Sequence, residues 1–189
     1  MNISYVKILF IHGYTASSHV DFYPTLVPLL NECGADYLIP NLPGGQHPHI
    51  HEWLSTIHNT IKDNTKPLVI VGHSLGTRAA LLYIEEFQQK VDHLFLIAPL
   101  ANRLENAQRR NKNYSDFFTS IVDVAKIKKL VNHSYVFHSK DDHSIPIEQG
   151  EEISRDINAE LIVSENRDHF SEPTNAKYIF SILTDRITS

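Results

Sequence analysis

The sequence predicts an α/β fold, a three-layer α/β/α sandwich around a six-stranded, mainly parallel sheet. The first observation is a set of short apolar runs rich in Val, Ile and Leu, which are typical of strands buried on both faces. The second is that helical patterns, with apolar residues three or four apart, lie between these runs. Strands that alternate with helices indicate parallel pairing, with helices on both faces of the sheet.

Six segments fit the strand pattern, and the second is the weakest of them: residues 6–11, 35–39, 68–71, 94–97, 135–137 and 161–163. The helical patterns are clearest over residues 22–33, 79–87 and 176–187. Gly34 follows the first of these patterns and is suited to end a helix there. The chain has 189 residues, enough for one sizeable core, so we expect a single domain over residues 1–189. Ligands of such folds bind beyond the carboxyl ends of the strands.

The composition argues against several classes of partner. The formal net charge of -5 and the pI near 6.2 disfavour nucleic acid and anionic membranes. Cys33 is the sole cysteine, so an internal disulfide cannot form. The sequence shows no targeting segment and no apolar run of about 18 residues, the length that spans a bilayer. We therefore expect a cytoplasmic protein whose partner is a small molecule, with no nucleic acid and no membrane.

The strongest motif is Gly-His-Ser-Leu-Gly at residues 72–76, directly after a predicted strand and before a helical pattern. This is the context that a nucleophile elbow requires. The sharp turn exposes the serine oxygen above the sheet, and a side chain at either glycine would clash with a neighbouring strand or helix. The helix N-terminus also favours developing negative charge. We expect Ser74 to be the nucleophile; the alternatives are a chance spacing and a decayed, inactive site.

The first predicted strand ends in His12, Gly13 and Tyr14. In a site with such an elbow, the loop after this strand donates one backbone N–H to the oxyanion. The residue after the nucleophile donates the other. The sequence therefore predicts an oxyanion hole made by the backbone N–H groups of Tyr14 and Leu75.

Two later segments can complete a set of serine, acid and histidine in the chain order that such sites use. His169 follows the last predicted strand and is the candidate general base. Asp141 and Asp142 follow the fifth predicted strand, and Pro146 is suited to the first position of the next helix. Successive side chains in a loop diverge, so only one of the two aspartates can aim at the imidazole. Asp168 is a third candidate, but it adjoins His169 in sequence and is poorly placed to bond its ring.

Two other segments are interpreted without a catalytic role. Residues 47–51 read His-Pro-His-Ile-His, with alternate histidines that an extended chain would point to one side. Metal binding is the alternative, but no cysteine lies near and Glu52 is the only adjacent carboxylate, so we expect a polar loop near the substrate mouth and no metal. Residues 101–130 carry five charged residues between positions 103 and 112, then Phe117 and Phe118. This segment is either a helical excursion over the site or a solvated crossover, and its polarity disfavours a large apolar lid.

Together these residues resemble the small serine hydrolases related to retinoblastoma-binding protein 9. The resemblance covers nearly the whole chain and is carried by Ile-His-Gly-Tyr-Thr-Ala-Ser-Ser at residues 11–18, the elbow around Ser74, Ser-Lys-Asp-Asp at residues 139–142 with Pro146, and Asp-His-Phe at residues 168–170. It implies a minimal α/β-hydrolase fold, a cytoplasmic location and a triad of Ser74, Asp142 and His169.

The resemblance also helps to choose the acid, and the sequence departs from the family pattern at two places. Matching the family loop Asp-x-x-x-Pro puts the acid four residues before Pro146, which favours Asp142 over Asp141. The family usually has glycine where this chain has Asp168, so a charge is added beside His169. Retinoblastoma binding rests on Leu-x-Cys-x-Glu, which is absent around Cys33, and that function is not expected here.

The sequence thus predicts a serine-type carboxylic ester hydrolase that needs no cofactor and acts on small acyl esters. Short or medium acyl chains are expected, because only residues 101–130 could roof the site. Two alternatives remain. One is amide, peptide or thioester cleavage by the same residues, and the other is a binding or regulatory protein with a vestigial site.

Overall fold

A computed structural model describes residues 3–101 and 112–189 of the chain. Six strands form one sheet in the order β2-β1-β3-β4-β5-β6, and every neighbouring pair is parallel. The strands are β1 (Lys7–Ile11), β2 (Asp36–Leu38), β3 (Leu68–His73), β4 (Val91–Ile97), β5 (Val131–Ser139) and β6 (Glu160–Ser164). The prediction of a six-stranded α/β sandwich is confirmed.

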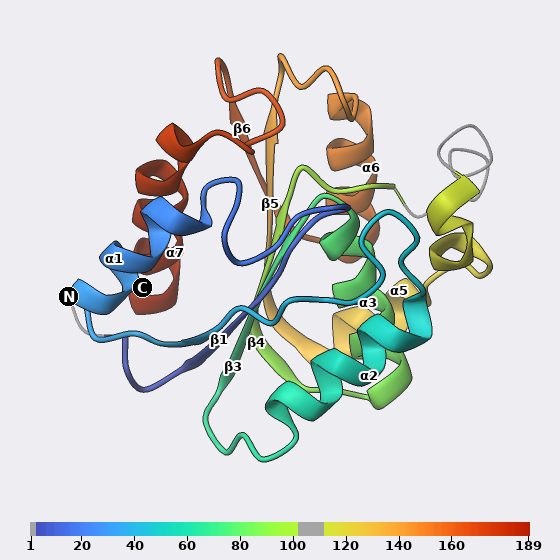
Figure 1. The fold of residues 1–189 in the computed structure, drawn as a ribbon, viewed down its shortest axis with the longest axis horizontal. Helices are drawn as coiled ribbons and strands as arrows, with labels where there is room; N and C mark the ends of the chain where they lie inside the picture. Colours follow the sequence, from blue (N-terminus) through green and yellow to red (C-terminus); the bar gives the residue numbers. More distant parts are fainter. Residues whose placement is uncertain (1–2, 102–111) are drawn as a thin grey trace.

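Helices cover both faces of the sheet (Figure 1). They are α1 (Tyr23–Glu32), α2 (Ile50–Ile61), α3 (Leu75–Phe87), α5 (Val124–Leu130), α6 (Ile147–Ile157) and α7 (Ala176–Thr188), with two 3-10 turns, η1 (Lys112–Phe118) and η2 (Pro173–Asn175). Helices α1 and α7 pack on one face, whereas α2, α3, α5 and α6 pack on the other. This gives the three layers that the alternating pattern of the sequence predicts.

The two layers of core follow from the alternation of side chains along each strand. In β1, Ile8 and Phe10 belong to the core under α1 and α7. Leu9 and Ile11 belong to the core under α2 and α3. All six residues of β3 are buried, as expected for a central parallel strand covered on both sides.

The strand order places the candidate residues at one edge of the sheet. From β1 the chain first adds β2 on one side and then β3 on the other, so the order reverses between β1 and β3. The loops after β1, β3, β5 and β6 all leave from carboxyl ends, because the strands are parallel. This is the edge at which α/β sheets bind ligands.

The segment 101–130 is partly outside the described residues, since residues 102–111 are not among them. Its later part forms η1 and α5. Pro146 precedes α6 as its N-cap residue, so the helix begins one position later than predicted. Among the residues that the structure describes, no helix has both the length and the apolar character needed to cross a bilayer.

Candidate active site

Ser74 lies on the sharp turn between β3 and α3, with φ 52° and ψ -121°. The glycines beside it make this turn possible. A Cβ at Gly76 would lie 2.1 Å from the carbonyl oxygen of Ile11, and one at Gly72 would lie 2.8 Å from the Cα of Thr77. Because both obstacles are backbone atoms, neither position accepts a side chain, as the sequence predicted.

His169 bridges Ser74 and Asp142 in a hydrogen-bonded chain. The Oγ of Ser74 lies 2.9 Å from His169 Nε2, and Asp142 Oδ2 lies 2.9 Å from His169 Nδ1. A carboxylate can only accept, so Nδ1 carries the ring proton and Nε2 is left to accept from the serine hydroxyl. Residues that are 95 and 27 positions from His169 in sequence are thus brought together in the order that proton abstraction from a serine requires.

The side chain of Asp142 is fully buried, and its second oxygen is also occupied. Oδ1 accepts the backbone N–H groups of Ser144 and Ile145, each at 2.8 Å. Burial opposes ionisation of this carboxyl, but the hydrogen bonds from His169 and from these two N–H groups outweigh it and hold the pKa of Asp142 below its usual value. The buried group is therefore a carboxylate with both oxygens oriented.

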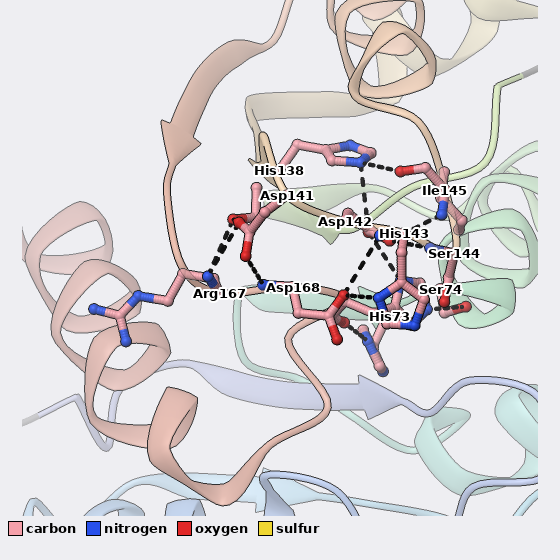
Figure 2. A network of polar contacts seen from close by, with 12 residues as sticks. His73, Ser74, His138, Asp141, Asp142, His143, Ser144, Ile145, Arg167 and Asp168 are labelled. Atoms are coloured by element: carbon pink, nitrogen blue, oxygen red, sulfur yellow. Dashed lines mark hydrogen bonds and ion pairs between the residues drawn. The ribbon is translucent and has the colours of Figure 1, made fainter.

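Asp141 joins the two loops, with its carboxylate turned toward Arg167 and Asp168 (Figure 2). Its carboxylate accepts from the Ser139 hydroxyl, the N–H of Arg167 at 3.4 Å and the N–H of Asp168 at 3.3 Å. The hydrogen bond from Ser139 is the main reason why the pKa of Asp141 lies below its usual value. Asp141 therefore fastens the loop after β6 to the loop after β5.

Asp168 also makes no contact with the ring of His169. Its Oδ1 lies 2.5 Å from Nδ1 of His143, and both side chains are open to solvent. Its φ is 48°, in the left-handed region that glycine adopts most easily. Glycine would adopt this backbone conformation without strain, and aspartate is one of the few other residues that tolerate it.

Two buried histidines that sequence analysis left without a role hold the loops of this site. His73 Nε2 lies 2.9 Å from the carbonyl oxygen of His169, and burial lowers the pKa of His73 to about 3. His12 accepts the N–H of Leu42 at Nε2 and donates from Nδ1 to Gly13, each at 2.9 Å. Burial also lowers the pKa of His12. A histidine at the buried end of an apolar strand is the sequence signal that could have indicated such roles.

A cleft of about 390 Å³ opens beside Ser74. The residues that line it are Tyr14, Ser74, Leu75, Leu100, Tyr114, Ser144, Ile145 and His169. The predicted oxyanion residues, Tyr14 and Leu75, thus lie at the same cleft as the hydroxyl and the imidazole. The Tyr14 hydroxyl donates to the carbonyl of Gln46 at 2.8 Å, and its ring meets that of Tyr114 edge to face at 4.9 Å. The described walls therefore combine apolar and aromatic side chains with hydroxyl groups and one imidazole.

The histidine segment 47–51 lies at the surface. His47, His49 and His51 are exposed, and His51 is already part of α2, so the segment is not extended throughout. Nδ1 of His49 lies 3.4 Å from Asp116. Within residues 3–101 and 112–189, no group of three or more His, Cys, Asp or Glu side chains is placed to hold a metal ion.

Comparison with known proteins identifies the family. The sequence profile of the serine hydrolase family matches residues 8–177. The chain is 29% identical over 186 residues to YdeN of Bacillus subtilis (strain 168), which is named as a hydrolase, with 94% of each chain covered. It is 28% identical over 137 residues to the serine hydrolase RBBP9 of Rattus norvegicus, covering 72% of this chain and 70% of that protein.

Solved structures agree with these relationships. The crystal structure of the B. subtilis YdeN protein matches with a TM-score of 0.85 and 26% identity, covering 97% of this chain and 99% of that one. Est1E from Butyrivibrio proteoclasticus, solved with bound ferulic acid, matches with a TM-score of 0.79 over 97% of this chain and 90% of that one. At 17% identity, that second likeness concerns the fold alone. The resemblance seen in the sequence is confirmed, and the chain belongs to the serine hydrolase family.

Proposed function

We propose that this serine hydrolase is a carboxylesterase that cleaves small, uncharged acyl esters through an acyl-enzyme at Ser74. The observation that carries the proposal is the hydrogen-bonded chain from Ser74 through His169 to the buried Asp142 at the mouth of a small cleft. A hydroxyl, an imidazole and a carboxylate in this order form the template of nucleophilic acyl transfer.

In the proposed mechanism, His169 Nε2 takes the proton of Ser74 as Oγ attacks the carbonyl carbon. The Asp142 carboxylate holds the ring through Nδ1–H and stabilises the imidazolium that forms. Backbone N–H groups of Tyr14 and Leu75 donate to the oxyanion. His169 then protonates the leaving alkoxide, and water attacks the acyl-enzyme by the same route in reverse roles.

Intrinsic reactivity favours an ester rather than an amide as the proposed substrate. The nitrogen of an amide must be protonated before it leaves the tetrahedral intermediate, and an amide is more strongly stabilised by resonance than an ester, so amide cleavage depends more on binding energy from remote parts of the substrate. The cleft measures about 390 Å³. Its described lining contains one histidine, His169, and no Asp, Glu, Lys or Arg. A compact, uncharged acyl group matches these walls.

The test uses p-nitrophenyl esters of acetate, butyrate, octanoate and palmitate, with matched thioester and anilide substrates. We expect turnover of the acetate and butyrate esters, weaker turnover of longer chains, and labelling by a fluorophosphonate probe that Ser74→Ala abolishes. Faster cleavage of the anilide or thioester would replace the ester assignment. Strong interfacial activation on triglyceride emulsions would contradict the small substrate. No labelling above the Ser74→Ala background would indicate a vestigial site.

A further inference from the structure

His138 is a buried histidine that lies directly beside the candidate acid (Figure 2). It is the penultimate residue of β5, and its side chain is fully buried. Its Nε2 lies 2.9 Å from the carbonyl oxygen of Ile145 and 3.6 Å from Oδ2 of Asp142. The ring therefore touches both ends of the short loop that begins with Asp142.

The contacts define the protonation of this ring. A carbonyl oxygen only accepts, so Nε2 carries the hydrogen and donates to Ile145, which leaves Nδ1 bare. Among the described residues Nδ1 has no hydrogen-bond partner, although it is buried. Burial lowers the pKa of His138, which keeps the ring neutral near pH 7. The titratable groups around it are Asp142, His169 and Glu148.

The position of His138 is costly for folding. A buried nitrogen without a hydrogen-bond partner destabilises the native state. The ring also requires a glycine in α6, because a Cβ at Gly150 would lie 2.3 Å from Nδ1 of His138. A Leu or Phe in this strand would fill the space without an unpaired polar atom, so packing alone does not explain the histidine.

Among the described residues, the imidazole of His138 makes one polar contact within hydrogen-bonding range. That contact fixes the loop that holds Asp142. The carbonyl that receives its Nε2–H belongs to Ile145. The N–H of Ile145, together with that of Ser144, orients Oδ1 of Asp142 and so leaves Oδ2 facing His169. We propose that His138 is a positioning residue for Asp142, holding its loop closed through the hydrogen bond from Nε2 to Ile145. This inference rests on the proposed function, in which Asp142 is the acid.

Two amide substitutions test the proposal with nearly the same chemistry. The amide nitrogen of His138→Gln reaches about as far as Nε2 and can still donate to Ile145, whereas that of His138→Asn stops at about the place of Nδ1. His138→Asn should lower kcat/KM on the order of 10- to 100-fold, because a small displacement of a catalytic group is amplified in the rate. Its acid limb should move to lower pH, since a misaligned Asp142 stabilises the imidazolium of His169 less. His138→Gln should keep both values close to those of the wild-type protein.

The matched control is His93→Asn, which changes another buried strand histidine. His93 lies near the start of β4 and pairs with Asp92, at the opposite end of the sheet from Ser74. It should leave the acid limb unchanged, so a general effect of lost core stability is separated from loss of positioning. If His138→Asn and His138→Gln have the same acid limb and the same kcat/KM, the positioning role is wrong.

Nuclear magnetic resonance of the wild-type protein gives a readout that needs neither a variant nor turnover. The ¹⁵N shifts of His138 should show a protonated Nε2 and a bare Nδ1; a proton on Nδ1 would overturn the proposal even if no variant folds. The far-downfield proton of the bond between His169 and Asp142 should persist in His138→Gln and be lost or moved in His138→Asn. If the wild-type protein hydrolyses nothing and does not label, the proposed function fails, while these resonances still report the positioning.

Discussion

Replacing each of three carboxylates by its amide would identify the acid of the site. In Asp142→Asn, the single side-chain oxygen is retained by the N–H groups of Ser144 and Ile145, which both donate at 2.8 Å. The new amide then turns an N–H toward His169, where Oδ2 now accepts at 2.9 Å. The imidazole must meet this donor with a bare Nδ1, so its proton moves to Nε2 and faces Ser74. A ring in that tautomer cannot take the serine proton.

The expected loss follows from this change of tautomer. An asparagine at the acid position of a serine triad lowers kcat by about 10⁴, equivalent to about 5.4 kcal/mol of transition-state stabilisation. Asp141→Asn and Asp168→Asn leave the ring contact intact. Asp168→Asn weakens a solvent-exposed contact with His143, which contributes about 1 kcal/mol or less. Asp141→Asn weakens the hydrogen bonds that the side chain accepts from two backbone N–H groups. The kcat of each of these two variants should therefore fall by about tenfold or less.

Initial rates on p-nitrophenyl acetate would measure all three variants, after circular dichroism has shown native folding. If Asp141→Asn loses most of its activity while Asp142→Asn stays active, the acid is Asp141 and not Asp142. If none of the three loses more than about tenfold, the chain from Ser74 to Asp142 does not carry the reaction and the reasoning fails.

Three further predictions concern the nucleophile, acid stability and the turn at residue 168. Ser74→Ala should fold normally and lose at least about 10⁴-fold in kcat; more than a few per cent of residual activity would exclude it as the nucleophile. His73 has a folded pKa of about 3 against 6.5 for the free side chain, so the fold favours its neutral form. The contribution of neutral His73 to stability is full above pH 6.5 and is lost as the pH falls toward 3, because the unfolded chain takes up the proton first. The free energy of unfolding, measured with urea between pH 7 and 4, should therefore fall less steeply with pH in His73→Gln, by up to about 1.4 kcal/mol per pH unit. Equal slopes in the two proteins would contradict this. Asp168→Gly should be more stable than Asp168→Ala by about 1 kcal/mol and should therefore melt at a higher temperature, since φ is 48° there and alanine is strained in the left-handed region. Equal melting temperatures of the two variants would show that this turn is not strained.

Much of the fold could be predicted because buried parallel strands are continuous apolar runs. The runs that lie in β1, β3 and β4 were located in this way, but the ends of strands were not. β5 begins at Val131, four residues before the predicted strand, and includes Asn132 and His133. These polar residues look like a loop in the sequence. They are held in the ladder because β4 also begins early, so that Val91 pairs with Val131 and His93 with His133.

The candidate site was predictable where a local rule governs it. Ser74 follows from the elbow pattern. The choice of Asp142 over Asp141 comes mainly from the resemblance to the family loop Asp-x-x-x-Pro, and the structure turns Oδ2 of Asp142 toward His169. The role of His138 had no such rule. Its contact depends on the path of the loop back to Ile145 and on the space left by Gly150 of α6, and both arise only from tertiary packing.

Gly76 and Ser74 are under two kinds of constraint, one from folding and one from chemistry, which a saturation-mutagenesis library would separate. Any side chain at position 76 meets the main-chain oxygen of Ile11, which cannot rotate aside. Selection for folding alone should therefore keep glycine there. At position 74, where φ is 52° and ψ is -121°, the same selection should let serine drift toward glycine. Serine should be retained at position 74 only when growth also depends on hydrolysis. Comparing residue frequencies after selection for folding with those after selection for hydrolysis would therefore show which positions are required for folding and which for chemistry.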